Sequence, residues 1–255
     1  MKDQTEKDLT PPFWGSRVIQ KIGANSLFEN IRENVLFQGR WQYTKGSLSD
    51  EEYEKMLDRE IRPEYSLLKE KIVKENLFEP SIIYGFFQCN SDNKNIIIFE
   101  KDSSKEIMSF SFPVEKKSPY RSIPGYILPL SSGKRDVMAF QIVTIGNRIN
   151  DELKKIYANN SFKRYFLLHG LSVESTEALA DICNSRIKKD MNISTGLRYS
   201  FGFPSCPDIT ENVKIYNLLD GKRIGISLTE EGQMVPEQST SAFIIFNPLA
   251  KYFKI

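Results

Sequence analysis

Residues 81–101 read Ser-Ile-Ile-Tyr-Gly-Phe-Phe-Gln-Cys-Asn-Ser-Asp-Asn-Lys-Asn-Ile-Ile-Ile-Phe-Glu-Lys. Within this stretch, residues 81–88 and 94–101 are rich in β-branched and aromatic side chains, which is typical of strands. The polar residues 90–93 between them are a suitable hairpin connection, because asparagine, aspartate and serine favour turns. Since a short hairpin joins antiparallel neighbours, the stretch predicts an antiparallel sheet.

Strand-like and helix-like segments lie on both sides of this hairpin. Residues 106–112 are a candidate third strand, and the apolar run at 136–145 suits the interior of a sheet. Two further strands are predicted at 224–229 and 242–246. Helices are predicted at residues 25–37, 49–75, 147–158, 161–189 and 209–219.

Individual residues predict where these helices begin and bend. Ser49 precedes three acidic residues and is expected to cap its helix, while Pro63 is expected to interrupt it. We expect helix 161–189 to be broken or bent near Gly170, and Asp208 or Thr210 to cap the helix that follows.

The order of these elements is neither repeated nor βαβ. We infer an α+β protein with a mainly antiparallel twisted sheet and surrounding helices. With 255 residues, 40% of them hydrophobic, the chain can bury a sizeable core. Because no Gly/Ser-rich linker divides it, we expect residues 1–255 to form a single domain, with residues 1–78 as a candidate helical N-terminal subregion.

Charge and hydropathy narrow the function classes. The 35 basic and 33 acidic residues nearly balance, which gives no strong attraction to nucleic acid, and Lys116-Lys117 and Lys188-Lys189 are expected on solvated faces. No apolar run approaches the roughly 20 residues that cross a bilayer, and residues 1–4 lack the apolar segment of a secretory signal. We therefore expect a cytoplasmic protein without membrane partners.

The cysteines and the single histidine do not indicate a metal centre. Cys89, Cys183 and Cys206 lack metal-ligand spacing, and their odd number fits a reducing compartment better than a disulfide framework. Cys206 is expected to pack as a small side chain. His169 lies in an apolar run and is expected to be a partly buried imidazole.

The segment Arg198-Tyr199-Ser200-Phe201-Gly202-Phe203-Pro204-Ser205-Cys206-Pro207-Asp208 has no regular periodicity. Its two prolines prevent a continuous helix, and Gly202 allows a backbone to approach a ligand closely. Arg198 offers a planar fork for a carboxylate or phosphate. By themselves, these residues fit either a shaped binding loop or an ordinary turn whose arginine pairs with a surface acid.

This segment resembles the Arg-Pro-x-Pro-Gly-Tyr-Pro-x-Cys-Pro-Asp signature of the S-adenosylmethionine-binding activation domain of cobalamin (vitamin B12)-dependent methionine synthase. Other parts of the family pattern occur in the same order along nearly the whole chain. They are residues 11–15 (Pro-Pro-Phe-Trp-Gly), 84–90 (Tyr-Gly-Phe-Phe-Gln-Cys-Asn), 130–136 (Leu-Ser-Ser-Gly-Lys-Arg-Asp), 177–180 (Glu-Ala-Leu-Ala), 234–236 (Met-Val-Pro) and 247–253 (Asn-Pro-Leu-Ala-Lys-Tyr-Phe).

The resemblance implies the same antiparallel α+β fold and a role in reductive methylation. The family presents S-adenosylmethionine to cob(II)alamin held by another module, with a flavodoxin-like protein as the electron donor. Because 255 residues leave no room for the other modules of methionine synthase, we expect a freestanding activation subunit of this methyltransferase system in methionine biosynthesis, rather than a complete enzyme. The alternatives are an activation or interaction protein for another corrinoid methyltransferase, and a non-catalytic S-adenosylmethionine-binding regulatory protein.

Two common classes of S-adenosylmethionine enzyme fit the residues poorly. A Rossmann-type methyltransferase needs a glycine-rich turn between a strand and a helix, and none is evident. A radical enzyme needs a close cysteine triad on an iron–sulfur cluster, which three scattered cysteines do not supply. We expect no catalytic triad and no dedicated general base.

The resemblance also assigns candidate cofactor-binding residues. Arg198 aligns with the family arginine that contacts S-adenosylmethionine, and its charge suits the ligand carboxylate. The other residues that the resemblance assigns to the ligand are Ser200, Gly202, Phe203, Tyr252, Phe253, Asn34 and Glu177.

Three features depart from the family pattern or leave alternatives open. Phe203 replaces a tyrosine, and the acidic loop that normally precedes the arginine is short here, at residues 191–196. At the N-terminal position where the family uses an aspartate, Asn34 and Glu33 are competing candidates. Tyr252 and Phe253 also fit simple packing, and Glu177 also fits a carboxylate on a helix surface.

Overall fold

The computed structural model describes residues 9–116 and 121–255. Its strands are β1 Gly15–Ile19, β2 Ser81–Asp92, β3 Asn95–Phe99, β4 Glu106–Ser111, β5 Asp136–Thr144, β6 Leu197–Tyr199, β7 Ser227–Leu228, β8 Met234–Val235 and β9 Ser239–Ile245. The α-helices are α1 Ala24–Phe28, α2 Asp50–Met56, α3 Arg62–Lys74, α4 Arg148–Ala158, α5 Phe162–Asp190 and α6 Asn212–Leu219. Two π-helical segments, Val35–Arg40 and Leu57–Ile61, and 3-10 turns at Ile123–Tyr126, Leu130–Ser132, Ile209–Glu211 and Gly221–Ile224 complete the described elements.

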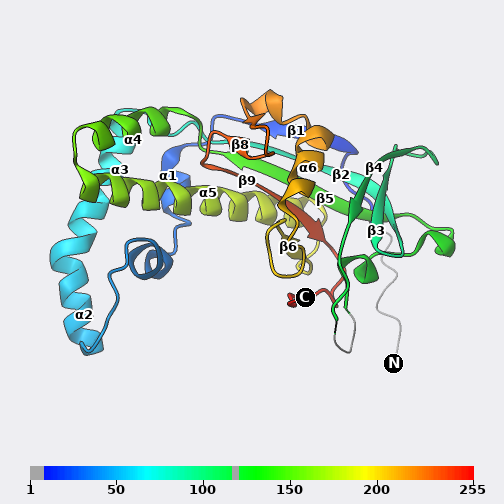
Figure 1. Cartoon of the computed structure of the whole chain (residues 1–255), viewed down its shortest axis with the longest axis horizontal. Coiled ribbons are helices and arrows are strands. Elements are labelled where there is room, and N and C mark those ends of the chain that lie inside the picture. Colours follow the sequence, from blue (N-terminus) through cyan, green and yellow to red (C-terminus); the bar gives the residue numbers. More distant parts are fainter. Residues whose placement is uncertain (1–8, 117–120) are drawn as a thin grey trace.

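Within the described residues, seven strands form one antiparallel sheet in the order β4-β3-β2-β5-β9-β6, with β1 added to β2 (Figure 1). The α+β fold with a mainly antiparallel sheet is thus confirmed. The long strand β2 pairs with β1 through its first half and with β3 through its second half, while β5 follows its other edge. Residues 90–92, expected in the hairpin loop, continue β2 instead, and the turn follows at Asn93, whose φ is 53°.

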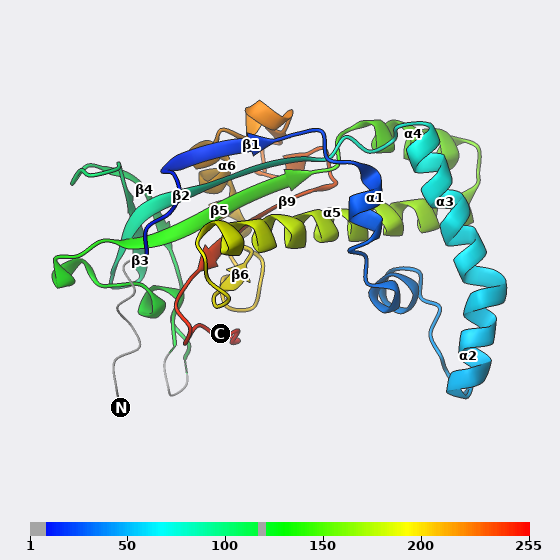
Figure 2. The ribbon, with the colours of Figure 1, turned by 180° about the vertical axis from the view of Figure 1, so that it is seen from behind.

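The sheet has an apolar core on each face. In β5, Val137, Ala139 and Val143 point toward the face covered by α5, and the alternating residues Met138 and Phe140 point toward the face covered by α6. Figures 1 and 2 show α5 and α6 on opposite sides of the sheet. This burial on both faces explains why the sequence of β5 is a continuous apolar run, as expected for a central strand.

Helix α5 is continuous over 29 residues, so the predicted break or bend near Gly170 is wrong. A Cβ atom built on Gly170 would lie 2.9 Å from Cδ1 of Trp41, and the Trp41 Nε1 donates to the Leu167 carbonyl at 2.9 Å. Gly170 is therefore present because the indole ring lies against the helix backbone, and not because the helix ends there.

The helical arm at residues 50–74 does not break, but its α-helical pattern is interrupted next to Pro63 as predicted, because the π-helical segment Leu57–Ile61 separates α2 from α3. Ser49 caps α2 as expected, because its Oγ accepts from the Glu52 N–H and the Glu52 carboxylate accepts from the Ser49 N–H. Pro63 lies in the first turn of α3, directly after the π-helical segment Leu57–Ile61. The wider turn accommodates a residue that lacks an N–H donor.

The N-terminal region is only partly helical. Residues 15–19 form strand β1 of the main sheet, so the helical part begins at Ala24. The predicted helix at 25–37 is divided into α1 and the π-helical segment Val35–Arg40, and Asn30 Nδ2 donates to the Ser26 carbonyl beside the end of α1. Such a side-chain bond competes with continuation of a helix.

The C-terminal third contains the elements around the predicted ligand loop. Strand β6 was not expected, whereas β9 begins three residues before its predicted position. The strand expected at 224–229 is reduced to β7, because residues 221–224 form a 3-10 turn. Asp208 caps residues 209–211 through its side chain, which accepts from the Thr210 N–H at 3.0 Å.

None of the helices in the described part of the chain is long and apolar enough to cross a membrane.

The contact between Gly170 and Trp41 predicts an unusual response to alanine. In a helix, Gly→Ala normally adds up to about 1 kcal/mol of stability. We expect Gly170→Ala instead to destabilise the fold by about 1–3 kcal/mol, because the added methyl group overpacks the indole contact. Denaturant unfolding measures the change.

Gly39→Ala is the matched control. A Cβ on Gly39 would meet Val35 Cγ1 at an ordinary 3.9 Å, so this variant should be as stable as the parent or slightly more stable. Equal stability of Gly170→Ala and the parent would show that the indole can move away without cost.

Candidate ligand-binding site

Arg198 lies on β6, the short strand at the edge of the sheet, rather than in a loop. It pairs with Ile244 of β9, and its side chain is only 15% exposed. The Arg198 Nη2 lies 3.0 Å from Glu177 Oε2 and 3.4 Å from Asp181 Oδ1, both on α5. Figure 2 shows β6 beside the C-terminal half of α5. The edge of the sheet and the helix thus meet through ion pairs.

Three carboxylates of α5 lie on one face of the helix, because Glu174, Glu177 and Asp181 are spaced by three and four residues. Glu174 is almost fully buried, at 2% exposure, whereas Glu177 and Asp181 are 34% and 46% exposed. Burial raises the pKa of Glu174, the cations of Arg40 and Arg32 oppose that rise, and the charge of Glu177 adds to it.

Residues 32–41, which we call the strap, lie against this face of α5. Arg40 Nε is 3.4 Å from Glu174 Oε2, and Arg32 Nη2 is 3.9 Å from Glu174 Oε1 and 4.0 Å from Asp181 Oδ2. Trp41 anchors the C-terminal end of the strap through its hydrogen bond to Leu167. Asp181 is therefore within reach of two arginines, Arg32 of the strap and Arg198 of β6.

The loop after β6 closes on itself through its backbone. The Gly202 N–H donates to the Cys206 carbonyl at 2.9 Å, and the Phe203 N–H donates to the Ser200 carbonyl at 3.0 Å. The φ of Gly202 is 102°, a conformation that favours glycine. Cys206 is 1% exposed and its Sγ also contacts the Ser200 carbonyl, at 3.2 Å, so it is a packing residue as expected.

The C-terminal residues complete this side of the molecule. Tyr252 Oη donates to the Arg198 carbonyl at 2.8 Å, and its ring is 57% exposed. Burial raises the pKa of Tyr252, while the charges of Arg198 and Asp181 act on it in opposite directions. A hollow of about 470 Å³ adjoins this tyrosine and is lined by Phe203, Pro204, Ser205, Tyr252, Phe253 and Lys254.

We call Arg198, Glu177, Asp181, Phe203 and Tyr252 the edge site. Of the residues predicted from the sequence, it brings together Arg198, Glu177, Phe203 and Tyr252. Phe253 lines the same hollow but is mostly buried in the core, at 7% exposure. Ser200 and Gly202 lie in the adjoining loop, where the Ser200 carbonyl and the Gly202 N–H are already bonded within the loop.

The N-terminal candidates are placed less favourably. Asn34 is exposed at the start of a π-helical segment, and no hydrogen bond of its side chain occurs within the described residues. Glu33 accepts from Arg62 Nε at 3.3 Å and is thereby directed to α3. Sequence reasoning missed Glu174, Asp181 and Arg32, although the helical spacing of the acids is readable in the sequence.

His169 is partly buried as expected. Its side chain is 31% exposed, its ring stacks on Tyr165, and its Nε2 lies 3.4 Å from Glu237 Oε1. It belongs to the same helix as the edge-site acids but lies two turns before Glu177.

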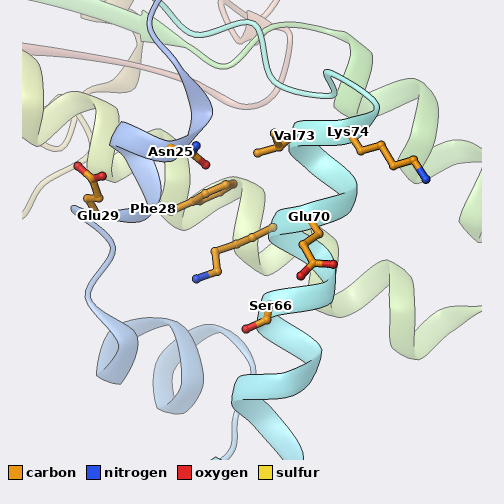
Figure 3. A pocket seen from close by; sticks show the side chains of 8 residues that line it. Asn25, Phe28, Glu29, Ser66, Glu70, Val73 and Lys74 are labelled. Atoms are coloured by element: carbon orange, nitrogen blue, oxygen red, sulfur yellow. The ribbon is translucent and has the colours of Figure 1, made fainter.

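A second and larger hollow, of about 790 Å³, lies between α1 and α3 and is shown in Figure 3. Phe28 of α1 points across it toward α3, and charged side chains of both signs surround the opening. Its lining residues are Asn25, Phe28, Glu29, Ser66, Lys69, Glu70, Val73 and Lys74. None of the residues predicted to bind a ligand lies there.

The family model for the vitamin B12-dependent methionine synthase activation domain matches residues 25–255. The chain belongs to this family. It is 30% identical, over 275 aligned residues and 96% of its length, to the methionine synthases of Mycobacterium tuberculosis and Mycobacterium leprae. It spans 23% of the length of those relatives.

A solved structure of the activation family has the same fold. The crystal structure of the MetH reactivation domain bound to AdoHcy superposes with a TM-score of 0.82 and 20% identity, covering 96% of this chain and 82% of that one. The fold described above is therefore that of a methionine synthase activation domain.

The buried carboxylate of Glu174 generates a pH prediction. Its pKa in the folded protein lies above its ordinary value of 4.5, so the folded state binds that proton more tightly than the unfolded state. The resulting stabilisation is present below pH 4.5 and is lost as the pH rises through the folded-state pKa. Relative to Glu174→Gln, which does not titrate, the parent should lose stability between acidic and neutral pH.

Parallel denaturant unfolding of the two proteins across that range measures the difference. At neutral pH we expect Glu174→Gln to be at least as stable as the parent, because an amide avoids the desolvation of a buried charge. If the parent instead gains stability over the variant as the pH rises, attraction to Arg32 and Arg40 outweighs burial.

Proposed function

We propose that this activation domain binds S-adenosylmethionine at the edge site and supports the reductive methylation of cob(II)alamin held by a cobalamin-binding module of methionine synthase. The observation that carries the proposal is the position of Arg198, which joins the acids of α5 to the aromatic hollow at Tyr252 in a chain of this family. The AdoHcy named for the MetH reactivation domain, the demethylated form of the same ligand, supports the choice of ligand.

The residues of the edge site fit the chemistry of this ligand. Its amino-acid end carries an ammonium and a carboxylate, and the site offers the carboxylates of Glu177 and Asp181 beside the guanidinium of Arg198. Both acidic contacts of Arg198 use Nη2, and no hydrogen bond of its Nε or Nη1 occurs within the described residues, so these two donors suit the ligand carboxylate.

Aromatic rings suit the other end of the ligand. Phe203 and Tyr252 are in edge contact, with centroids 6.2 Å apart, and both line the hollow together with Phe253. A purine ring packs favourably against such side chains. We assign Ser200 and Gly202 to shaping the loop that carries Phe203, because their bonded backbone groups hold that turn closed.

The chemistry of methyl transfer belongs to the cofactors. In the reaction of the family, a reductant would supply one electron to cob(II)alamin, and the reduced cobalamin would accept the sulfonium methyl of S-adenosylmethionine, which leaves S-adenosylhomocysteine. The protein binds and orients the sulfonium and limits competing reactions. We propose a flavodoxin-like protein as the reductant and the cobalamin-binding modules of methionine synthase as the partner.

Substitution of Arg198 tests the ligand assignment. Arg198→Ala should bind S-adenosylmethionine about tenfold to a hundredfold more weakly in calorimetric titration, since a charge-assisted hydrogen bond contributes about 1.5–3 kcal/mol. Arg198→Lys should recover only part of that loss, because an ammonium cannot reproduce the two-donor geometry.

Arg186→Ala is the matched control. Arg186 also pairs with an acid of α5, Asp190, but is 55% exposed and lies outside the edge site, so its removal should leave affinity unchanged. Thermal unfolding without ligand identifies a damaged fold. A folded Arg198→Ala protein with the affinity of the parent would show that the ligand binds elsewhere.

Because the proposed function assigns ligand binding to this protein and methyl acceptance to a cobalamin on its partner, it predicts what the isolated protein does. It should bind S-adenosylmethionine but transfer little methyl group to small acceptors until a cobalamin-loaded methionine synthase module and a reductant are added. Radiolabelled methyl transfer measures both conditions. Absence of binding at millimolar ligand would remove the proposal, and rapid transfer to a small acceptor without cobalamin would indicate an ordinary methyltransferase.

A further inference from the structure

Arg32 is the charged residue of the strap that is least committed to a partner. Its Nη2 lies 3.9 Å from Glu174 and 4.0 Å from Asp181, and its side chain is 60% exposed. Both distances are at the outer limit of an ion pair and too long for a hydrogen bond. The guanidinium is therefore attracted to the acids of α5 while its donors stay available.

The other charged groups of the strap are engaged at shorter distances. Arg40 lies 3.4 Å from Glu174, and Glu33 pairs with Arg62 of α3 at 3.3 Å. Arg32 is the strap residue that reaches Asp181, the acid shared with Arg198. It is consequently the only described strap cation in contact with the edge site.

A ligand with a free amino-acid end carries both charges, so it can replace an ion pair without changing the total charge. Asp181 is 46% exposed and can accept the ammonium of the ligand. The guanidinium of Arg32 is then released from Asp181, and its long exposed side chain can meet the carboxylate of the ligand. Arg198, at 15% exposure, is held by Glu177 and stays in place.

We propose that Arg32 is a further ligand-binding residue of the edge site, which contacts the carboxylate of the ligand from the strap side, opposite Arg198, while Asp181 accepts the ammonium. This inference rests on the proposed binding of S-adenosylmethionine. It assigns the ligand contact from the N-terminal region to Arg32 in place of Asn34 or Glu33. The side chain that contacts the ligand from this region is then a cation.

The test compares two probes that differ in a single group. S-adenosylmethionine carries the carboxylate, and decarboxylated S-adenosylmethionine lacks it but keeps the ammonium, the sulfonium and the adenosine. Calorimetric titration of both probes is carried out on the parent, Arg32→Gln, Arg32→Lys and Arg40→Gln. Arg40→Gln is the matched control, because it also removes a strap guanidinium beside Glu174 but none that reaches Asp181.

We expect Arg32→Gln to weaken S-adenosylmethionine binding by about threefold to tenfold, as for a partly exposed charge-assisted contact. Its affinity for the decarboxylated probe should remain within about twofold of the parent. Arg32→Lys should retain part of the discrimination between the probes, high salt should reduce it, and Arg40→Gln should match the parent with both.

The outcomes separate this inference from the proposed function. If the parent binds neither probe, the proposed function and this inference both fail. If the parent binds S-adenosylmethionine and Arg32→Gln binds it equally well, only the inference fails. An equal loss of both probes in Arg32→Gln, or the same loss in Arg40→Gln, would assign Arg32 to holding the strap and would also overturn it.

Discussion

The candidate site depends on the attraction of Glu177 and Asp181 on α5 to two arginines from distant parts of the chain, Arg198 and Arg32. On the same face of α5, Glu174 pairs with Arg40 of the strap, and Glu177 pairs with Arg198 of β6. Asp181 lies within reach of both Arg32 and Arg198. Apart from these pairs, the strap is held to α5 by the hydrogen bond from Trp41 Nε1 to the Leu167 carbonyl, but that bond does not reach the edge of the sheet.

The position of β6 explains how the candidate ligand site is built at this edge of the sheet. An edge strand leaves backbone groups without a neighbouring strand, which natural proteins protect with short strands or with covering segments. Here the strand has three residues, and the Tyr252 hydroxyl bonds the free carbonyl of Arg198. Tyr252 also lines the aromatic hollow, so the same residue both protects the edge strand and forms part of the candidate site.

The central sheet could be predicted from the sequence, whereas contacts between distant segments could not. The strands β2, β3, β4 and β5 follow local apolar and β-branched patterns, and the structure confirms them. β6 has too few residues for any periodic signal. Gly170 was interpreted from local propensity as a helix breaker, but it lies inside a continuous helix and packs against Trp41. The interruption predicted at Pro63 takes the form of a π-helical segment rather than a break, which propensity does not specify.

The same reasoning applies to the site. Arg198, Phe203 and Tyr252 were identified by resemblance, because their motifs are local in sequence. Asp181 and Arg32 are separated by well over a hundred residues and meet only after folding, so no motif joins them. Their pairing was therefore visible only in the structure.

The strap combines a buried end at Trp41 with an exposed charge at Arg32, and this combination bears on how the proposed ligand would bind. Trp41 is buried at 3% exposure against the backbone of α5, so the strap itself need not move when a ligand arrives. Only the exposed Arg32 side chain has to change partners, which costs at most about 2 kcal/mol of side-chain conformational entropy. A ligand end that carries both an ammonium and a carboxylate offsets this cost, because it supplies a new partner for Asp181 and another for Arg32. A ligand end with a single charge leaves one of these two side chains without a partner.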